Sequence, residues 1–255
     1  MSFIKRTMAS LGIGGIQVDT ILDQEEVKAG EVITGTVYLK GGMVEQELRN
    51  VNVCLKQRYP RKDVDNGYSI NTIAYVAILE GRVIQEREEI SVPFELEVPL
   101  DAFITCPSLS IWVNTEADVV QAVDPVDHDD LWIRPCPLHQ QIIHALNQIG
   151  FVSRQVDFEP NYNQKLGRFD HAQEWEFTPI TPQMGKKFDE LEFIFDFRDD
   201  HLCLWVTIDE RSDLFSELLD VDEYRKKLIF NYQQSYSTDE ISSMLTGLLK
   251  EWLEK

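Results

Sequence analysis

The segment from residue 16 to residue 42 constrains the fold most, because it has the pattern of two strands joined by a turn. Apolar and polar residues alternate there with the period of two that puts every second side chain on one face of a strand. Gly30 interrupts the alternation, since glycine accepts backbone angles that other residues resist. The expected inward residues are Ile16, Val18, Thr20 and Leu22, then Ile33, Gly35, Val37 and Leu39, with Thr34, Thr36 and Tyr38 facing out and Gly41-Gly42 ending the second strand. The segment predicts an antiparallel β scaffold without chemistry of its own.

The rest of the first half repeats this pattern. Strand-like stretches cover residues 51–55, 70–79, 90–98, 109–113, 117–123 and 131–134. Several short strands separated by turn signals, without a helical period, are typical of an antiparallel sandwich. We therefore expect one β-sandwich over residues 1–135.

The pattern changes to a helical one after Pro135. Apolar residues recur at helical spacing from Leu138 to Ile149, and Gly150 stands where a helix C-cap belongs. This predicts a linker helix over residues 136–150. Strand patterns return at 152–158, 175–177, 191–197 and 202–208, with a turn at 198–201. They predict a second, smaller sandwich over residues 151–236.

The last nineteen residues, 237–255, predict an amphipathic helix. Ser237 and Glu240 have the spacing of a capping box. Apolar residues follow at the i, i+3, i+4, i+7 spacing of one helix face. Two uses of this face stay open. It could dock a partner protein or another copy of the chain, or it could cover a sheet of the second domain or the linker. If a partner docks there, the anchors are Met244, Leu248, Leu249 and Trp252.

Composition narrows the function. The formal net charge of −20 disfavours binding to nucleic acid phosphates and favours basic partners. The chain has no apolar run of the roughly 18 residues that a membrane span requires. The N-terminal segment gives at most weak contact with a membrane surface, through the apolar residues Phe3, Ile4, Met8 and Leu11 beside the basic residues Lys5 and Arg6. Its four cysteines are scattered, which indicates buried thiols in a reducing compartment, and we expect a cytoplasmic protein.

Catalytic motifs are not apparent in the sequence, and we expect neither an enzyme nor a cofactor. The five histidines are dispersed, and nucleophile-elbow, phosphate-loop and zinc-helix patterns are missing. Paired glutamates such as Glu174 and Glu176 are interpreted as the solvent side of strands. A weak calcium candidate is the acidic turn that carries Asp124, Asp127, Asp129 and Asp130, although it lacks the alternating order of a calcium loop.

Motifs distributed over most of the chain, to about residue 210, resemble those of the bacterial sporulation-control protein family of SpoOM type, whose members look like arrestins. The motifs are Val18-Asp-Thr-Ile-Leu22, Gly35-Thr-Val37, Lys40-Gly-Gly42, Val92-Pro-Phe94, Ile111-Trp-Val-Asn-Thr115, Ala122-Val-Asp-Pro125 and Gln173-Glu-Trp-Glu-Phe177. The resemblance implies a mainly β fold of two tandem arrestin-like sandwiches and a non-enzymatic, regulatory or scaffold role through protein–protein contacts. The alternative is a ligand- or carbohydrate-binding β-sandwich that uses Trp112 or Trp205 as a stacking platform.

Overall fold

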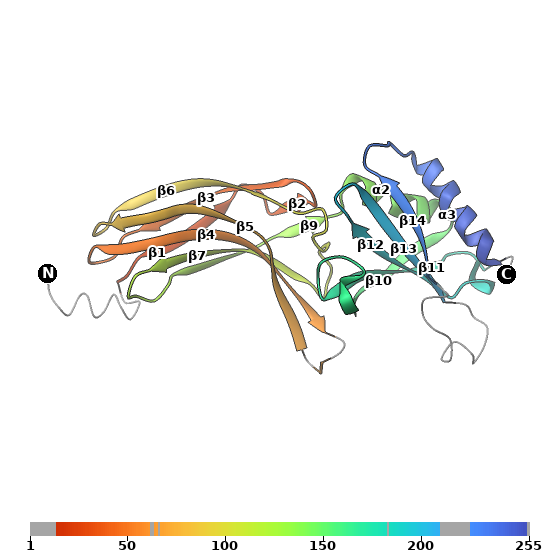
Figure 1. Ribbon diagram of the computed structural model, residues 1–255, viewed down its shortest axis with the longest axis horizontal. Coiled ribbons are helices and arrows are strands. Elements are labelled where there is room, and N and C mark those ends of the chain that lie inside the picture. The colour runs from red at the N-terminus through yellow and green to blue at the C-terminus, as the bar shows by residue number, and fades with distance from the viewer. Residues whose placement is uncertain (1–13, 62–63, 66, 183, 210–224, 254–255) are drawn as a thin grey trace. The chain divides into compact units, whose positions relative to one another are not determined.

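The two strands expected at the start of the chain pair antiparallel in the computed structural model of the protein, which describes residues 14–61, 64–65, 67–182, 184–209 and 225–253 (Figure 1). Strand β1 (Gln17–Leu22) pairs with β3 (Val32–Lys40), so that Gln17 lies opposite Lys40 and Leu22 opposite Gly35. The short strand β2 (Glu26–Lys28) lies between them in sequence. Gly30 follows it with a φ of 87°, which confirms the predicted use of glycine at this turn.

The first compact unit consists of the described residues up to 59 together with residues 69–134. Its first sheet has the order β1-β3-β6, with β6 (Glu89–Glu97) antiparallel to β3. Its second sheet has the order β5-β4-β7-β8, formed by β4 (Gln46–Arg61), β5 (Gly67–Ile84), β7 (Ser110–Val119) and β8 (Val126–Asp130). Strand β9 (Trp132–Arg134) pairs parallel with β2. The two larger sheets lie against each other as layers (Figure 1).

The buried residues of this unit are the inward members of the alternating patterns. From the first sheet they include Ile33, Val37, Leu39, Phe94 and Leu96, and from the second sheet Val51, Val53, Leu55, Ile111 and Val113. Each such side chain gains roughly 1.5–3 kcal/mol when it leaves water. The predicted inward set of β3 is confirmed, and Tyr38 faces solvent as expected.

The structure corrects the expected strands between residues 117 and 134. Residues 117–123 do not form a separate strand, because β7 continues to Val119 and the chain then turns, with Gln121 at a φ of 56°. The acidic segment that was expected as a turn is strand β8, which pairs antiparallel with β7 from Trp112 opposite Asp130 to Glu116 opposite Val126.

The second compact unit takes residues 60–68 and the chain from Pro135 onward. Five strands form one antiparallel sheet in chain order, namely β10 (Phe151–Pro160), β11 (His171–Pro179), β12 (Glu190–Phe197), β13 (His201–Asp209) and β14 (Arg225–Asn231). Two 3-10 helices, η1 (Tyr162–Gln164) and η2 (Met184–Lys186), lie in its loops. The expected turn at 198–201 is present, since the Arg198 amide donates to the His201 carbonyl at 2.9 Å.

Two helices take the place that a second sheet would have in a sandwich. Helix α2 (Pro137–Gln148) and helix α3 (Thr238–Leu253) contact each other, and their apolar faces share one core with the five-stranded sheet. The helices contribute Ile142, Ala145, Leu146, Ile241, Leu245, Leu248, Leu249 and Trp252 to this core. The mainly β class with two helices is confirmed, while in the second unit the described strands form one sheet where we expected two.

The predicted helix ends are confirmed. Gly150 follows α2 with a φ of 95°, and its amide donates to the Asn147 carbonyl at 3.1 Å. At α3 the Glu240 amide donates to Ser237 Oγ at 3.2 Å, and the Ser237 amide donates to Glu240 Oε2 at 2.7 Å, which is a complete capping box. Within the described residues, neither helix is long and apolar enough to cross a membrane.

All four cysteines are free thiols, and Cys54, Cys136 and Cys203 are buried while Cys106 is half-buried. Burial is the main cause that raises the pKa of the Cys54, Cys136 and Cys203 thiols. A raised pKa leaves little reactive thiolate at neutral pH. The three buried cysteines therefore act as small apolar side chains.

Candidate functional site

Strand alternation gives the β1-β3-β6 sheet of the first unit a solvent side, and we call this side the outer face. Register places its residues in rows, with Gln17, Lys40 and Glu89 across one end and Asp19, Tyr38 and Ser91 in the next row. Further along, Ile21, Thr36 and Pro93 form a third row. Tyr38 is 44% exposed and Ile21 55% exposed, so apolar area lies at the centre of a largely polar face.

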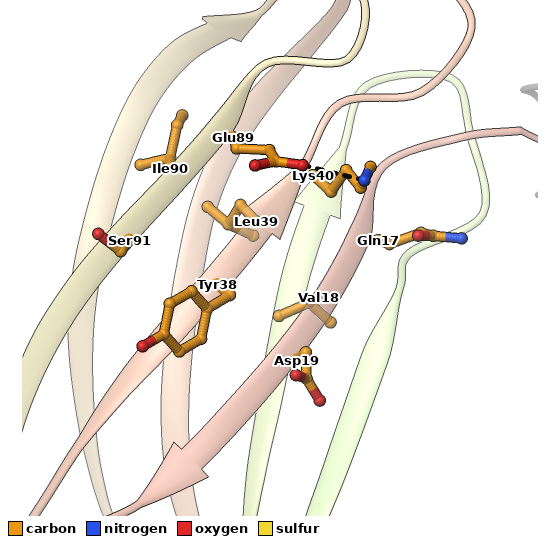
Figure 2. A pocket seen from close by; sticks show the side chains of 9 residues that line it. All are labelled: Gln17, Val18, Asp19, Tyr38, Leu39, Lys40, Glu89, Ile90 and Ser91. Atoms are coloured by element: carbon orange, nitrogen blue, oxygen red, sulfur yellow. Dashed lines mark hydrogen bonds and ion pairs between the residues drawn. The ribbon is translucent and has the colours of Figure 1, made fainter.

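The outer face is hollowed at the end near residue 17. This hollow has a volume of about 460 Å³. Figure 2 shows the side chains that line it, which come from residues 17–19 of β1, 38–40 of β3 and 89–91 of β6. Lys40 Nζ lies 2.9 Å from Glu89 Oε1 at its rim, and both side chains are exposed. An exposed pair of this kind contributes little to stability, typically below about 1 kcal/mol. Both charges thus remain available to a binding partner.

A second hollow of about 340 Å³ lies toward the other end of the same three strands. It is lined by Asp23, Thr34, Gly35, Thr36, Pro93, Phe94 and Glu95. Among the residues that line the two hollows, Lys40 is the only cation, while Asp19, Asp23, Glu89 and Glu95 are acidic. The outer face therefore combines negative charge with an apolar centre, a surface that complements a basic partner.

The carboxylates of the calcium candidate do not converge. The described residues contain no group of three or more His, Cys, Asp or Glu side chains that could hold a metal ion. Asp124 Oδ1 accepts from the Val119 amide at 2.9 Å, while Asp130 points to His128 at 3.3 Å. The reason is local structure, because β8 is a strand and its alternate side chains point to opposite faces.

One of these carboxylates instead joins the two sheets of the first unit. Asp127 Oδ2 accepts from the amide of Thr20 in β1 at 2.6 Å, although β1 and β8 belong to different sheets. Asp129 follows on the same face of β8. The pKa of the Asp129 carboxyl is raised to about 6. Burial is the largest cause, followed by the charge of Asp127, a hydrogen bond with Asp127 and the charge of Asp19, while the charge of His128 lowers the pKa by a smaller amount. Asp129 is therefore protonated in mildly acidic solution and donates to Asp127.

Replacing Asp129 with Asn is expected to stabilise the protein above pH 6 and to have little effect near pH 4. A carboxyl whose pKa is higher in the folded state lowers stability as the pH rises from about 4 to about 6. The full shift corresponds to about 3 kcal/mol, and solvent screening at this partly exposed site reduces it to roughly 1–2 kcal/mol. Urea unfolding of Asp129→Asn and wild type at pH 4 and pH 7.5 measures the difference.

The matched control is Asp130→Asn, which removes the same charge from the exposed, opposite face of β8. It is expected to change stability by less than about 0.5 kcal/mol at either pH. Equal effects of the two variants would show that the change in net charge, and not the contact between β1 and β8, causes the stabilisation.

The residues proposed as helix anchors lie inside the second unit. Leu248, Leu249 and Trp252 are at most 7% exposed, and Met244 packs against the same core. Lys226 of β14 lies 4.7 Å from the ring centre of Trp252 and forms an ion pair with Glu251 at 2.7 Å. A partner would reach these apolar side chains only if α3 left the sheet. In this structure they stabilise the fold.

Neither tryptophan of the carbohydrate alternative offers an open ring. Trp112 is 9% exposed, and its ring stacks on His128 with centres 5.2 Å apart. Trp205 is half-buried, donates from its indole nitrogen to Asp196 at 3.3 Å, and has Lys227 Nζ 5.4 Å from its ring centre. The exposed tryptophan is Trp132 in the short strand β9, which the sequence reasoning missed because only the sheet pairing shows which way it faces.

The most deeply buried histidine of the second unit serves packing. His139 is fully buried, its ring centre lies 3.6 Å from that of Phe195, and burial lowers its pKa to about 3. It is a neutral core residue. The interpretation of the paired glutamates as solvent-facing is wrong for Glu174, because residues 171–174 are all buried and the start of β11 is covered on both faces.

Comparison with known proteins agrees with this architecture. Residues 4–212 match the family described as SpoOM protein. The sporulation-control protein Spo0M of Bacillus subtilis strain 168 is 31% identical over 261 residues, an alignment that spans 100% of both chains. The crystal structure of Spo0M from Bacillus subtilis superposes with a TM-score of 0.83 at 30% identity and covers 94% of this chain and 100% of that one. The segments Phe3–Leu11 and 210–224 lie outside the described residues, and with them the weak membrane-contact prediction.

Proposed function

The chain belongs to the SpoOM protein family, and on this premise we propose that it is a regulatory protein that acts by binding other proteins and catalyses no reaction. The related Bacillus subtilis protein is named for sporulation control, and we propose a control role of the same kind for this chain. We also propose a cytoplasmic location, which the four free cysteines support.

The outer face is the observation that carries the proposal. It presents two hollows on one sheet, exposed apolar area at Ile21 and Tyr38, and carboxylates around both hollows. Interfaces typically place aromatic and apolar side chains at the centre and polar groups at the rim. Opposite charge across the rim speeds association and selects partners. The partner class is therefore a protein surface or segment that carries Lys or Arg beside apolar side chains.

A photo-cross-linker placed on the outer face tests this proposal. Tyr38 is replaced by p-benzoylphenylalanine in the full chain, expressed in the cell that makes the protein, and cross-linked products are identified by mass spectrometry. The aromatic replacement keeps the size and exposure of Tyr38. Tyr162, which is 74% exposed in the second unit, receives the same replacement as a control. We expect a discrete partner that cross-links from position 38 and not from position 162.

Charge reversal then checks the chemistry of binding to that partner. Asp19→Lys lies in the row of Tyr38 on the outer face, and we expect it to weaken binding about tenfold and to reduce the dependence of binding on salt. Asp157→Lys, in β10 of the second unit, makes the same charge change elsewhere. Identical product patterns from positions 38 and 162, or equal binding by both lysine variants, would contradict a role of the outer face.

A further inference from the structure

Two strand edges of the first unit face each other across its two sheets. Among the described strands, β1 pairs only with β3 and β8 pairs only with β7, so each has one edge outside its own sheet. The chain joins the two edges at two points. The Thr20 amide donates to Asp127 Oδ2 at 2.6 Å, and the Trp132 amide donates to the Glu25 carbonyl at 2.9 Å.

A hollow lies between these two points, and we call it the edge hollow. It has a volume of about 550 Å³ and is lined by residues 20–22 of β1, Glu25, residues 129–130 of β8 and Trp132. Ligand sites commonly have volumes of about 300–1,000 Å³. Ile21 lines the edge hollow and also lies in the third row of the outer face, so the two surfaces adjoin.

The edge hollow is acidic and has no cation of its own. Glu25, Asp129 and Asp130 line it, and none of the described residues that line it is Lys, Arg or His. The charges of Asp19 and Asp127 act on Asp129 as well. Carboxylates gathered in a hollow attract a positively charged ligand.

Asp129 is the carboxyl that this arrangement leaves without compensation. Its Oδ2 atom is buried and receives no hydrogen bond from the described residues. The titratable groups that act on it are Asp19 of β1 and Asp127 and His128 of β8, and only His128 favours its ionised form. From β7, the apolar Val113 lies opposite it. A carboxyl whose raised pKa lowers the stability of the fold is typical of a functional site, and a cation beside it would remove the penalty.

Trp132 adds an aromatic surface to the carboxylates. Its side chain is 51% exposed, and the Arg134 guanidinium lies 5.4 Å from its ring centre. Arg134 is paired with Glu26, since Nη2 lies 2.7 Å from Glu26 Oε2. Cations within about 6 Å of a tryptophan ring centre are attracted to the ring face. The exposed ring area is therefore available to a second cation, one that enters the edge hollow.

The geometry favours a guanidinium over a metal ion or an ammonium group. The described residues contain no group of three or more His, Cys, Asp or Glu side chains that could hold a metal ion. A guanidinium is planar, stacks on aromatic rings and donates in a fork to more than one oxygen. An ammonium group is a compact, strongly hydrated charge without that plane.

We propose that the edge hollow binds an arginine side chain of a partner protein, with the guanidinium against Trp132 and its N–H groups directed to Asp129 and Glu25. The inference rests on the proposed function and deepens it, because it names the residue that holds a basic partner beside the outer face. The bound cation favours the ionised carboxylate of Asp129, so Asp129 releases its proton on binding. The affinity therefore rises as the pH increases through 6.

NMR titration of the purified full chain with N-acetyl-L-arginine methylamide tests the proposal. We expect shifts of the Trp132 indole signal and of the amide signals of residues 20–22, with a dissociation constant of about 1 mM. The citrulline analogue has the same shape without the charge and should cause no shift. The lysine analogue should bind at least about threefold more weakly. Lowering the pH from 7.5 to 5 should weaken binding of the arginine probe about fivefold.

Variants assign the binding to the edge hollow. Asp129→Asn and Trp132→Leu are each expected to weaken binding about fivefold, and Asp129→Asn should also remove most of its pH dependence. Because Asp129→Asn is expected to stabilise the fold, its loss of binding would not result from unfolding. Asp199→Asn removes the same charge from an exposed turn of the second unit and should bind as wild type does. Circular dichroism checks that Trp132→Leu is folded.

The proposal would be overturned if the arginine probe shifted no signal of the edge hollow, or if the citrulline analogue bound equally well. Wild-type affinity in Asp129→Asn or Trp132→Leu would overturn it too. Tighter binding of free L-arginine than of the capped probe would indicate a small-molecule site, and a response to calcium chloride alone would indicate a metal site. Either result contradicts an arginine of a partner. The titration needs no partner, so it can fail while the cross-link from position 38 succeeds, and the reverse.

Discussion

Leu245→Ala in α3 is expected to lower the free energy of unfolding of the second unit by about 2–5 kcal/mol, the range for a buried leucine truncated to alanine. Leu245 is 1% exposed and belongs to the core that α2, α3 and the five-stranded sheet share. Truncation removes buried apolar surface and leaves a cavity that the surrounding strands fill only partly. Urea unfolding followed by the fluorescence of Trp175 and Trp205 reports this unit.

Removal of the whole helix is expected to have a larger effect than any single substitution in it. Without residues 237–255 the sheet would expose Leu204, Val206 and Phe230, which are fully buried in the same core. We expect the truncated chain to be insoluble or to lose cooperative unfolding of the second unit. The sequence left two roles open for this helix. If its role were to dock a partner, the truncated chain would stay folded and would lose only the binding of that partner.

Lys250→Ala is the control for Leu245→Ala, since Lys250 is exposed in the last turn of the same helix. Its effect should stay within about 0.5 kcal/mol, as for other surface substitutions. A truncated chain that keeps the unfolding transition of the second unit would contradict the packing role of α3. It would return Met244 and Trp252 to the set of candidate docking residues.

Alternation and periodicity predict an element and its apolar face, but not what covers that face. The inward residues of β3 and the helical stripe of α3 are both confirmed as buried. That the helices, and not a second sheet, cover the strands of the second unit could not be predicted, because an amphipathic helix fits either a sheet of its own chain or a partner.

Strand β8 could not be predicted for a different reason. Three aspartates among its five residues give it low strand propensity, and its strand conformation depends on pairing with β7 across the sheet. The candidate outer face was partly predictable, since alternation alone turns Tyr38 to solvent. Its hollows depend on the registers of three strands that are distant in sequence, and no local pattern encodes those.

The glycine pair that ends β3 shows how a short motif can carry a packing requirement. A Cβ at Gly42 would lie 2.1 Å from the Gly14 carbonyl oxygen, and one at Gly41 would lie 2.1 Å from the Gln85 carbonyl oxygen. Both oxygens are in use, because Gly14 accepts from the Met43 amide and Gln85 from the Glu88 amide. A side chain at either position therefore displaces backbone and not a flexible side chain.

Gly42→Ala is accordingly expected to lower the free energy of unfolding of the first unit by about 2–3 kcal/mol, at the upper end of the usual cost of overpacking. Gly247→Ala should do the opposite. Gly247 lies on the exposed side of α3, where an added methyl group would have no neighbour within 4 Å, and alanine favours the helix by about 0.5–1 kcal/mol. Urea unfolding of both variants measures whether the free energy of unfolding falls or rises. A Gly42→Ala variant with an unchanged free energy of unfolding would show that the close approach of Gly14 does not constrain this position. The glycine pair would then serve the flexibility of the turn.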